Sequence, residues 1–194
     1  MKWVLRIFGG FAALLIIAVA VLLALGQRAD AGRVRVSAEL NASPEQVWPW
    51  LNDSGKLKQW ITWLVEIRQD EPGTRVGTKQ VWVMRDSNNA GQLMEMEGTF
   101  TQYQPPARES VHIQSAGMFD GQQTYSVQDL GGGRARLEID GTYHYSQWFA
   151  ALLEPLITPA AEKKLVRDMA RLKSLVESEA IRKGEKNGTA RSAF

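Results

Sequence analysis

The side chains that could do chemistry in this chain are few. The sequence contains no cysteine, which excludes disulfides, thiolate metal ligands and a cysteine nucleophile. It contains two histidines, His112 between two apolar residues and His144 between two tyrosines. Because neighbouring side chains on a strand point to opposite faces, we expect both histidines to point away from the apolar face. A metal centre would need further converging ligands, so we predict neither a metal nor another cofactor.

The sequence does not identify any acidic residue as a general acid or base. Glu95 with Glu97, and Glu138 with Asp140, alternate with apolar residues. We therefore expect these carboxylates to lie on a solvated outer face of a sheet. No carboxylate is clearly placed inside the sheet to act as an acid or a base. A run of glycines, 131–133, joins two predicted strands and opens no helix, so it is not a phosphate-binding loop. No catalytic set is evident, and whether the chain is an enzyme stays open.

The apolar faces of the same segments carry a mixture of methionine, tyrosine and tryptophan. Methionine adapts to ligands of varied shape, and a few oriented hydroxyls inside an apolar pocket are typical of a small-molecule site. Ordinary core packing is the alternative explanation for these side chains. Our candidate ligand-binding residues are Trp50, Trp63, Trp82, Met84, Met94, Met96, Phe100, Tyr125, Tyr143 and Tyr145.

Tryptophan is concentrated in one short stretch, residues 43–64, which holds Trp48, Trp50, Trp60 and Trp63. We expect Trp48 to pack under the sheet and Trp60 to fill a junction between helix and sheet. Trp50 and Trp63 could instead line or cover the mouth of a cavity, because large aromatics form rigid apolar walls. Exposed members of the group could also touch lipid headgroups.

The elements that would position these residues begin with a strand. Residues 33–40 alternate between apolar and polar, which is typical of a half-buried strand. Ser43 and Gln46 then form a capping-box pattern that predicts the start of a helix. Pro49 should shorten or kink this helix because proline lacks the N–H donor. A second short helix is predicted over 56–61.

Residues 62–146 show alternating segments separated by turn signals, which predicts a series of strands. Short connections between successive strands favour an antiparallel meander. No crossover helix interrupts them, which argues against a doubly wound α/β fold. The predicted strands cover residues 63–68, 79–85, 93–104, 109–115, 122–129 and 134–145.

A long helix is predicted over residues 148–181, and Pro155 and Pro159 should bend its first part. Asp168 is expected to face water, and residues 184–194 are polar and predicted to be a disordered tail. One apolar face of the sheet must be buried, and this helix is the only element long enough to cover it. Its apolar stripe consists of Leu165, Met169, Leu172 and Val176.

The amino-terminal segment is apolar enough to be a membrane anchor. Residues 7–25 form a stretch of 19 residues without a charge, and at about 1.5 Å per residue such a helix nearly spans a hydrocarbon core of about 30 Å. A cleaved signal peptide is the alternative, with residues 29–31 as its site, but the apolar stretch is long for one. We favour an uncleaved anchor over 1–26, a linker over 27–32 and one domain over 33–183.

The basic residues give only a weak indication of the membrane orientation of the chain. Lys2 and Arg6 precede the apolar stretch, and they nearly balance Arg28, Arg33 and Arg35, which follow it. We favour a single-pass membrane protein with a cytoplasmic amino terminus and an extracytoplasmic domain.

Several stretches, taken in order, resemble the START-like or SRPBCC superfamily. They are RVRVSAELNASPEQVWPWLND from residue 33, Trp60, VGTKQVWVM, TFTQYQPPARESVHIQ and MARLKSLVESE. The superfamily includes polyketide cyclases, proteins similar to the birch-pollen allergen and lipid-transfer domains. The resemblance covers residues 33–182. It implies an α+β helix-grip fold, in which a curved antiparallel sheet of about seven strands surrounds a long C-terminal helix.

This fold does not determine one function. A formal net charge of +2 is too small for a typical nucleic-acid-binding domain, so we expect no nucleic-acid partner. We favour membrane-anchored binding of a hydrophobic or amphipathic small molecule, lipid-like or polyketide-like. The alternatives are an enzyme of the polyketide cyclase or dehydratase type, and a non-catalytic protein-interaction module with a filled core. A solid interior without a cavity above about 300 Å³ would favour the last of these.

Overall fold

The computed structural model describes residues 2–26, 32–86 and 90–191, and most of the predicted linker lies outside these ranges. In chain order the elements are α1 (Lys2–Gly26), β1 (Arg33–Leu40), α2 (Pro44–Val47), α3 (Pro49–Asn52), α4 (Ser54–Trp60), β2 (Leu64–Gln69), β3 (Lys79–Asp86), β4 (Gln92–Gln104), β5 (Arg108–Ser115), β6 (Phe119–Gly131), β7 (Arg134–Tyr145) and α5 (Trp148–Arg191). All seven predicted strands are present, with boundaries that differ by at most three residues.

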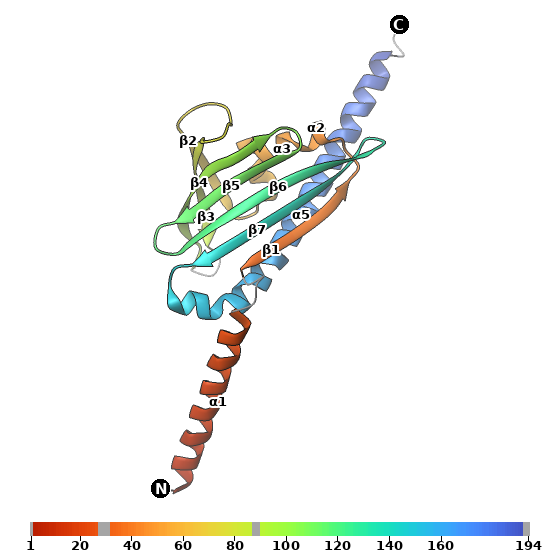
Figure 1. Ribbon diagram of the computed structural model, residues 1–194. Helices are drawn as coiled ribbons and strands as arrows, with labels where there is room; N and C mark the ends of the chain where they lie inside the picture. Colours follow the sequence, from red (N-terminus) through yellow and green to blue (C-terminus); the bar gives the residue numbers. More distant parts are fainter. Residues whose placement is uncertain (1, 27–31, 87–89, 192–194) are drawn as a thin grey trace.

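The strands form one antiparallel sheet in the order β1-β7-β6-β5-β4-β3-β2. Each strand from β2 to β7 pairs with the next along the chain, and β1 joins the free edge of β7. The sheet curves around α5, while α2, α3 and α4 lie near one end of it (Figure 1). This arrangement confirms the predicted α+β helix-grip architecture.

The short helices form where the sequence predicted a helix that proline would interrupt. The Gln46 side chain accepts a hydrogen bond from Ser43 N at 2.9 Å, as in a capping box. Helix α2 ends at Val47 and α3 begins at Pro49, which confirms the expected interruption. Asp53 then caps α4 by accepting a hydrogen bond from Lys56 N at 2.9 Å.

The core lies between the concave face of the sheet and α5. The predicted stripe of α5 faces it, with Met169, Leu172 and Val176 almost fully buried and Leu165 half-buried. The expectation that Asp168 faces water is wrong, since this carboxylate is buried and accepts a hydrogen bond from Thr62 Oγ1 at 3.0 Å. The hydrogen bond compensates the carboxylate for the water that it loses.

Helix α5 is longer than predicted. It continues to Arg191, whereas the sequence led us to expect disorder from Gly184 onwards. Adding a residue to an existing helix costs far less than starting one, so a polar segment can extend a helix that packing has already formed.

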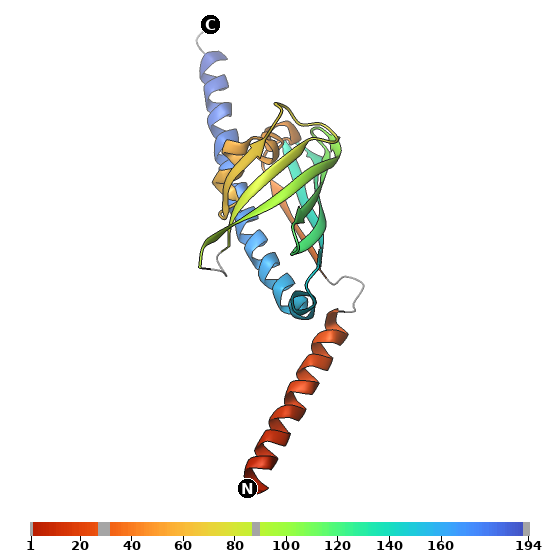
Figure 2. The ribbon, with the colours of Figure 1, turned by 90° about the vertical axis from the view of Figure 1, so that its left-hand side faces the viewer.

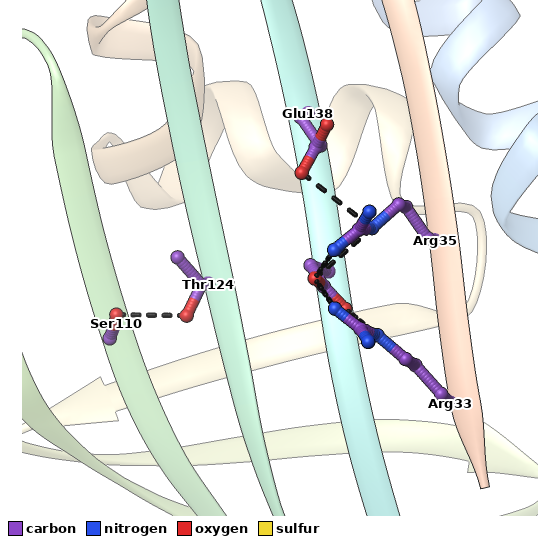
Figure 3. A network of polar contacts seen from close by, with 6 residues as sticks. Arg33, Arg35, Ser110, Thr124 and Glu138 are labelled. Carbon is purple, nitrogen blue, oxygen red and sulfur yellow. Dashed lines mark hydrogen bonds and ion pairs between the residues drawn. The ribbon is translucent and has the colours of Figure 1, made fainter. Parts of the chain in front are cut away.

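The convex face of the sheet is polar, as the alternation of acidic residues predicted. Arg33 and Arg35 of β1 both donate to Asp140 of β7 at 2.6 Å, and Arg35 also lies 3.7 Å from Glu138 (Figure 3). The hydrogen bond from Arg33, aided by Arg35, lowers the pKa of Asp140 to about 2. Farther along the same face, the hydroxyls of Ser110 and Thr124 lie 2.9 Å apart.

Helix α1 projects from the domain, and its side chains between Arg6 and Leu25 are almost all exposed (Figure 2). By length and composition it could cross a membrane, although a signal sequence would have the same properties. Within the described residues it contacts α5.

Candidate ligand-binding site

A chain of polar side chains runs across the concave face of the sheet. Glu109 of β5 is in register with Tyr125 of β6 on one side and with Tyr103 of β4 on the other. Side chains paired in this way share a face of the sheet and lie next to each other. Glu109 is 1% exposed and Tyr125 is 2% exposed, so a carboxyl and a phenol meet inside the core.

Glu109 is a buried carboxyl that the sequence reasoning missed. We identified no carboxylate clearly placed inside the sheet, whereas Glu109 lies there. The signal was available, because Val111 and Ile113 were expected to point inward and the same alternation turns Glu109 inward.

The electrostatics of Glu109 follow from its burial. Loss of water raises its pKa to about 7, and a hydrogen bond with Asn52 of α3 opposes this shift. Within the described part of the chain, Glu109 Oε2 and Asn52 Oδ1 have no hydrogen-bond partner. The site therefore offers one unused oxygen on each side chain, and Glu109 can carry or release a proton near neutral pH.

The row of polar side chains on the concave face continues to β7 through Tyr125 and Tyr143. Tyr143 donates a hydrogen bond to Gln123 Oε1 at 2.8 Å, and Gln123 Nε2 donates to the Tyr125 hydroxyl. Burial raises the pKa of both tyrosines above the ordinary value, so both hydroxyls stay protonated. The Tyr143 ring lies against Gly121 and Gly141, where a Cβ atom would approach the ring within 2.6 and 2.9 Å respectively.

A cleft of about 520 Å³ opens beside this interior. It lies between the short helices and the β2–β3 end of the sheet. The loop that follows β2 stands at the end of the domain far from α1 in both views (Figures 1 and 2). The cleft is lined by Asn52, Ser54, Ile67, Gln69, Asp70, Glu71, Pro72, Gly73, Thr74 and Gln80.

Two side chains connect the cleft with the core. Asn52 lines the cleft and hydrogen-bonds Glu109. Gln80 also lines it, donates to Gln69 Oε1 at 2.6 Å and accepts from Trp82 Nε1 at 2.9 Å. The inner wall of the cleft is therefore made of amides whose other partners belong to the buried polar and aromatic groups.

The candidate ligand-binding residues lie in the core rather than in this cleft. Trp50, Trp82, Met84, Met96, Phe100 and Tyr125 are buried, whereas Trp63, Met94, Tyr143 and Tyr145 are partly buried. They belong to, or pack against, one continuous apolar cluster. None of them is among the residues that line the 520 Å³ cleft. Their role in ligand binding stays a prediction.

Two of the four tryptophans in the stretch 43–64 pack as expected, whereas Trp50 and Trp63 do not line the cleft. Trp48 and Trp60 are buried, and Trp60 Nε1 donates to Trp50 O at 2.9 Å. The Trp48 ring packs 5.8 Å from that of Tyr103. These contacts confirm that Trp48 and Trp60 pack in the core. The rings of Trp50 and Trp63 lie under lysine ammonium groups, at 4.3 Å from Lys56 Nζ and 4.4 Å from Lys164 Nζ.

Both histidines lie where alternation predicted, away from the core. His112 Nε2 is 2.8 Å from Asp120 Oδ2 on the convex face, and His144 is exposed. Across the described residues, no three His, Asp or Glu side chains gather in a way that could hold a metal ion.

The curved antiparallel sheet and the long helix that it surrounds define a helix-grip protein. Residues 31–177 match the family model described as "Polyketide cyclase / dehydrase and lipid transport". The chain belongs to this family. A comparison with curated proteins gives no significant match.

Solved structures with the same fold are distant in sequence. A conserved protein from Geobacillus kaustophilus has a TM-score of 0.62 at 12% identity, over 75% of this chain and 95% of that one. Protein CV1439 from Chromobacterium violaceum has a TM-score of 0.60 at 22% identity, over 75% and 97%. CalU16 from Micromonospora echinospora has a TM-score of 0.53 at 15% identity, over 83% and 86%. These similarities establish the fold alone.

Proposed function

We propose that this domain binds a hydrophobic or amphipathic small molecule, lipid-like or polyketide-like, while α1 holds it at a membrane. The observation that carries the proposal is the cleft whose inner wall, Asn52 and Gln80, is hydrogen-bonded to the buried groups Glu109 and Trp82. A ligand that displaces or bridges these amides gains access to the apolar interior.

The free energy of binding would come mainly from burial. An apolar group gains about 25 cal/mol for each Å² that it removes from water. The interior contains Met84, Met94 and Met96, which adapt their shape more easily than branched side chains do. We predict that these methionines bind the ligand together with the neighbouring aromatic residues, because methionine side chains can adjust to its shape.

The polar groups would then set the orientation of the ligand. Glu109 and Asn52 each present an oxygen without a partner among the described residues, so a hydroxyl or amine on the ligand would satisfy a buried acceptor. An entirely apolar ligand would leave both oxygens unsatisfied. We therefore favour an amphipathic ligand over a pure hydrocarbon.

A thermal shift on the full chain in phosphatidylcholine nanodiscs tests this function, with dodecanol and dodecylamine as probes. A bound probe should raise Tm, because it binds the folded state alone. Ser54→Trp should fill the cleft and abolish the shift, since Ser54 is exposed and lines it. Val76→Trp is the matched control on an exposed site outside the cleft lining. An unchanged Tm in the parent chain, or equal shifts in both variants, would contradict the proposal.

A second candidate function, proton-transfer catalysis of the cyclase or dehydratase kind, is favoured by one observation. Glu109 is buried and its pKa is raised to about 7, which suits a general acid or base at neutral pH. A poly-β-ketone ester serves as the probe, with its loss of water followed by absorbance. A rate that inflects near pH 7 and disappears in Glu109→Gln would support catalysis, and a rate unaffected by this substitution would exclude Glu109 from it.

A further inference from the structure

The first part of α5 carries an unusual amount of exposed apolar surface. Trp148 is 79% exposed and Leu156 is 61% exposed, and Phe149 and Leu153 are also exposed. Phe149, Leu153 and Leu156 follow the spacing i, i+4 and i+7, so they share one face of the helix. A soluble surface seldom gathers several large apolar side chains within so few residues.

Charge is nearly absent from the same section. Between His144 and Glu162 the only acidic or basic residue is Glu154. Glu154 turns towards the domain, because its Oε1 is buried and lies where a Cβ on Gly32 would be, at 2.4 Å. The outward surface of residues 148–160 is therefore apolar and uncharged.

The first part of α5 lies near the end of α1. Gly32 is held against the end of β7, where it accepts a hydrogen bond from Tyr143 N at 3.0 Å. Only five residues separate Gly32 from Gly26, the last residue of α1, so the Cα atoms of these two glycines lie at most about 22 Å apart. Because α5 begins three residues after β7 ends, the end of α1 and the start of α5 lie at the same end of the domain.

The two views agree on the direction of the section. In Figure 1 the first turns of α5 run across the base of the domain, beside the end of α1, and in Figure 2 they are seen nearly end-on. Pro155 and Pro159 lie inside α5, and the helix changes direction after its first turns. If α1 crosses a membrane, this section lies along the membrane surface.

We propose that residues 148–160 form an interfacial membrane contact, with Trp148, Phe149, Leu153 and Leu156 inserted among the lipid headgroups and upper acyl chains. The inference rests on the proposed anchoring by α1. A helix with a wide apolar face and a tryptophan suits this depth. Met118 extends the surface, because its loop is tied to the start of α5 by the hydrogen bond from Ser146 N to Met118 O at 2.9 Å. The second contact fixes the domain, so that the cleft faces away from the bilayer.

Single-cysteine labelling tests this contact directly, because the chain has no cysteine of its own. Phe149→Cys and Leu156→Cys, made in the full chain, carry an environment-sensitive NBD label and are reconstituted in phosphatidylcholine vesicles. Leu15→Cys on α1 reports the anchor, and Val76→Cys is the exposed control. Val76 belongs to the segment between β2 and β3, which lies at the end of the domain far from α1 (Figure 1). All four sites are exposed, so labelling should not disturb folding.

We expect lipids with a doxyl group on the acyl chain to quench the labels at positions 149 and 156 at least about twofold, and the label at 76 hardly at all. Quenching at 15 without quenching at 149 and 156 would overturn the contact and leave the anchor intact. Quenching at 149 and 156 but not at 15 would support the contact and overturn the anchor. Absence of quenching at all sites would overturn both.

A protein partner on the same surface gives a different result. If a second copy or another protein covered residues 148–160, emission at 149 and 156 would shift to the blue without quenching by doxyl lipids. That outcome would overturn the membrane contact.

Discussion

Glu109 is the residue on which the function that we propose for the interior depends. It is almost fully buried, it contacts Asn52 and it lies beside Tyr125. A buried carboxyl that stays neutral can donate one hydrogen bond and accept others, whereas the ionised form accepts only. The protonation state of Glu109 would therefore decide which ligand groups the interior accepts.

The pH dependence of stability measures this protonation. The pKa of Glu109 is about 7 in the folded chain against 4.5 for the free side chain, so the folded state keeps a proton that the unfolded state releases. The stabilising contribution is complete below pH 4.5 and is lost as the pH rises through 7. Over this window it amounts to about 3 kcal/mol. Urea unfolding of the parent chain and Glu109→Gln, from pH 4.5 to 8, should show that the variant loses this slope.

The matched control for this experiment is Glu97→Gln on the convex face, where the side chain is exposed. This variant should keep the same slope as the parent chain. Equal slopes in Glu109→Gln and the parent chain would show that Glu109 is ionised in the folded protein at all these pH values.

For single residues, the alternation of apolar and polar positions was the main guide to which face of the sheet a side chain lies on. It placed the histidines and the acidic pairs outside correctly, and applied to Glu109 it would have placed that residue inside. The hydrogen bonds of Glu109 with Asn52 and of Gln80 with Trp82 could not be predicted in the same way. The first depends on how a short helix docks on a distant strand, which local patterns do not encode.

Among the elements, β6 and β7 are paired around a close contact between Tyr143 and two glycines. Tyr143 lies flat over Gly141, and a Cβ there would stand 2.7 Å from the tyrosine hydroxyl and 2.9 Å from its ring. Because Gly141 has no side chain, the Tyr143 ring can occupy this position, from which its hydroxyl reaches Gln123. Two residues on the same face of one strand are coupled in this way.

A double-mutant cycle tests the coupling. Gly141→Ala should destabilise the parent chain by about 1 to 3 kcal/mol, because the added methyl group collides with Tyr143. The same change in a Tyr143→Ala background should cost much less, as all three nearest atoms belong to Tyr143. Chemical denaturation of the four proteins gives the coupling energy, and a value of zero would mean that other atoms resist the methyl group.

The pairing of β1 with β7 is reinforced on the convex face. Asp140 accepts from both Arg33 and Arg35, and its pKa is lowered to about 2. We expect Asp140→Asn to destabilise the chain by about 1 kcal/mol at neutral pH, as exposed ion-pair networks do. The difference from the parent chain should vanish as the pH falls through 2, where Asp140 gains its proton.

Glu66→Gln is the control for this experiment, because Glu66 makes a single exposed ion pair with Arg68 at 3.6 Å. Its effect on the urea midpoint should be smaller than that of Asp140→Asn. Equal effects would mean that the two arginines do not act together on Asp140.

Elements were the part of the structure that the sequence predicted best. Strand alternation and the capping signal at Ser43 gave the order of helices and strands, because both arise from short-range geometry. The end of α5 was predicted too early. The alternation also gave no sign of the cleft, since its wall combines α3, β2, β3 and a loop.

The whole molecule places its two proposed surfaces at opposite ends. Helix α1 and the exposed start of α5 lie at one end, and the loop beside the cleft lies at the other (Figures 1 and 2). A domain held to a bilayer by the first end would expose its cleft to the aqueous phase. This geometry favours exchange of the ligand with a soluble carrier or enzyme over direct uptake from the bilayer.

The central claim is that the interior beside the cleft accepts an amphipathic molecule. Native mass spectrometry of the full chain, released gently from nanodiscs, tests it most directly. We expect a small amphipathic molecule bound to the parent chain and to Val76→Trp, and its loss from Ser54→Trp, in which the cleft is filled. A parent chain without such a molecule, or equal occupancy in Ser54→Trp, would contradict it.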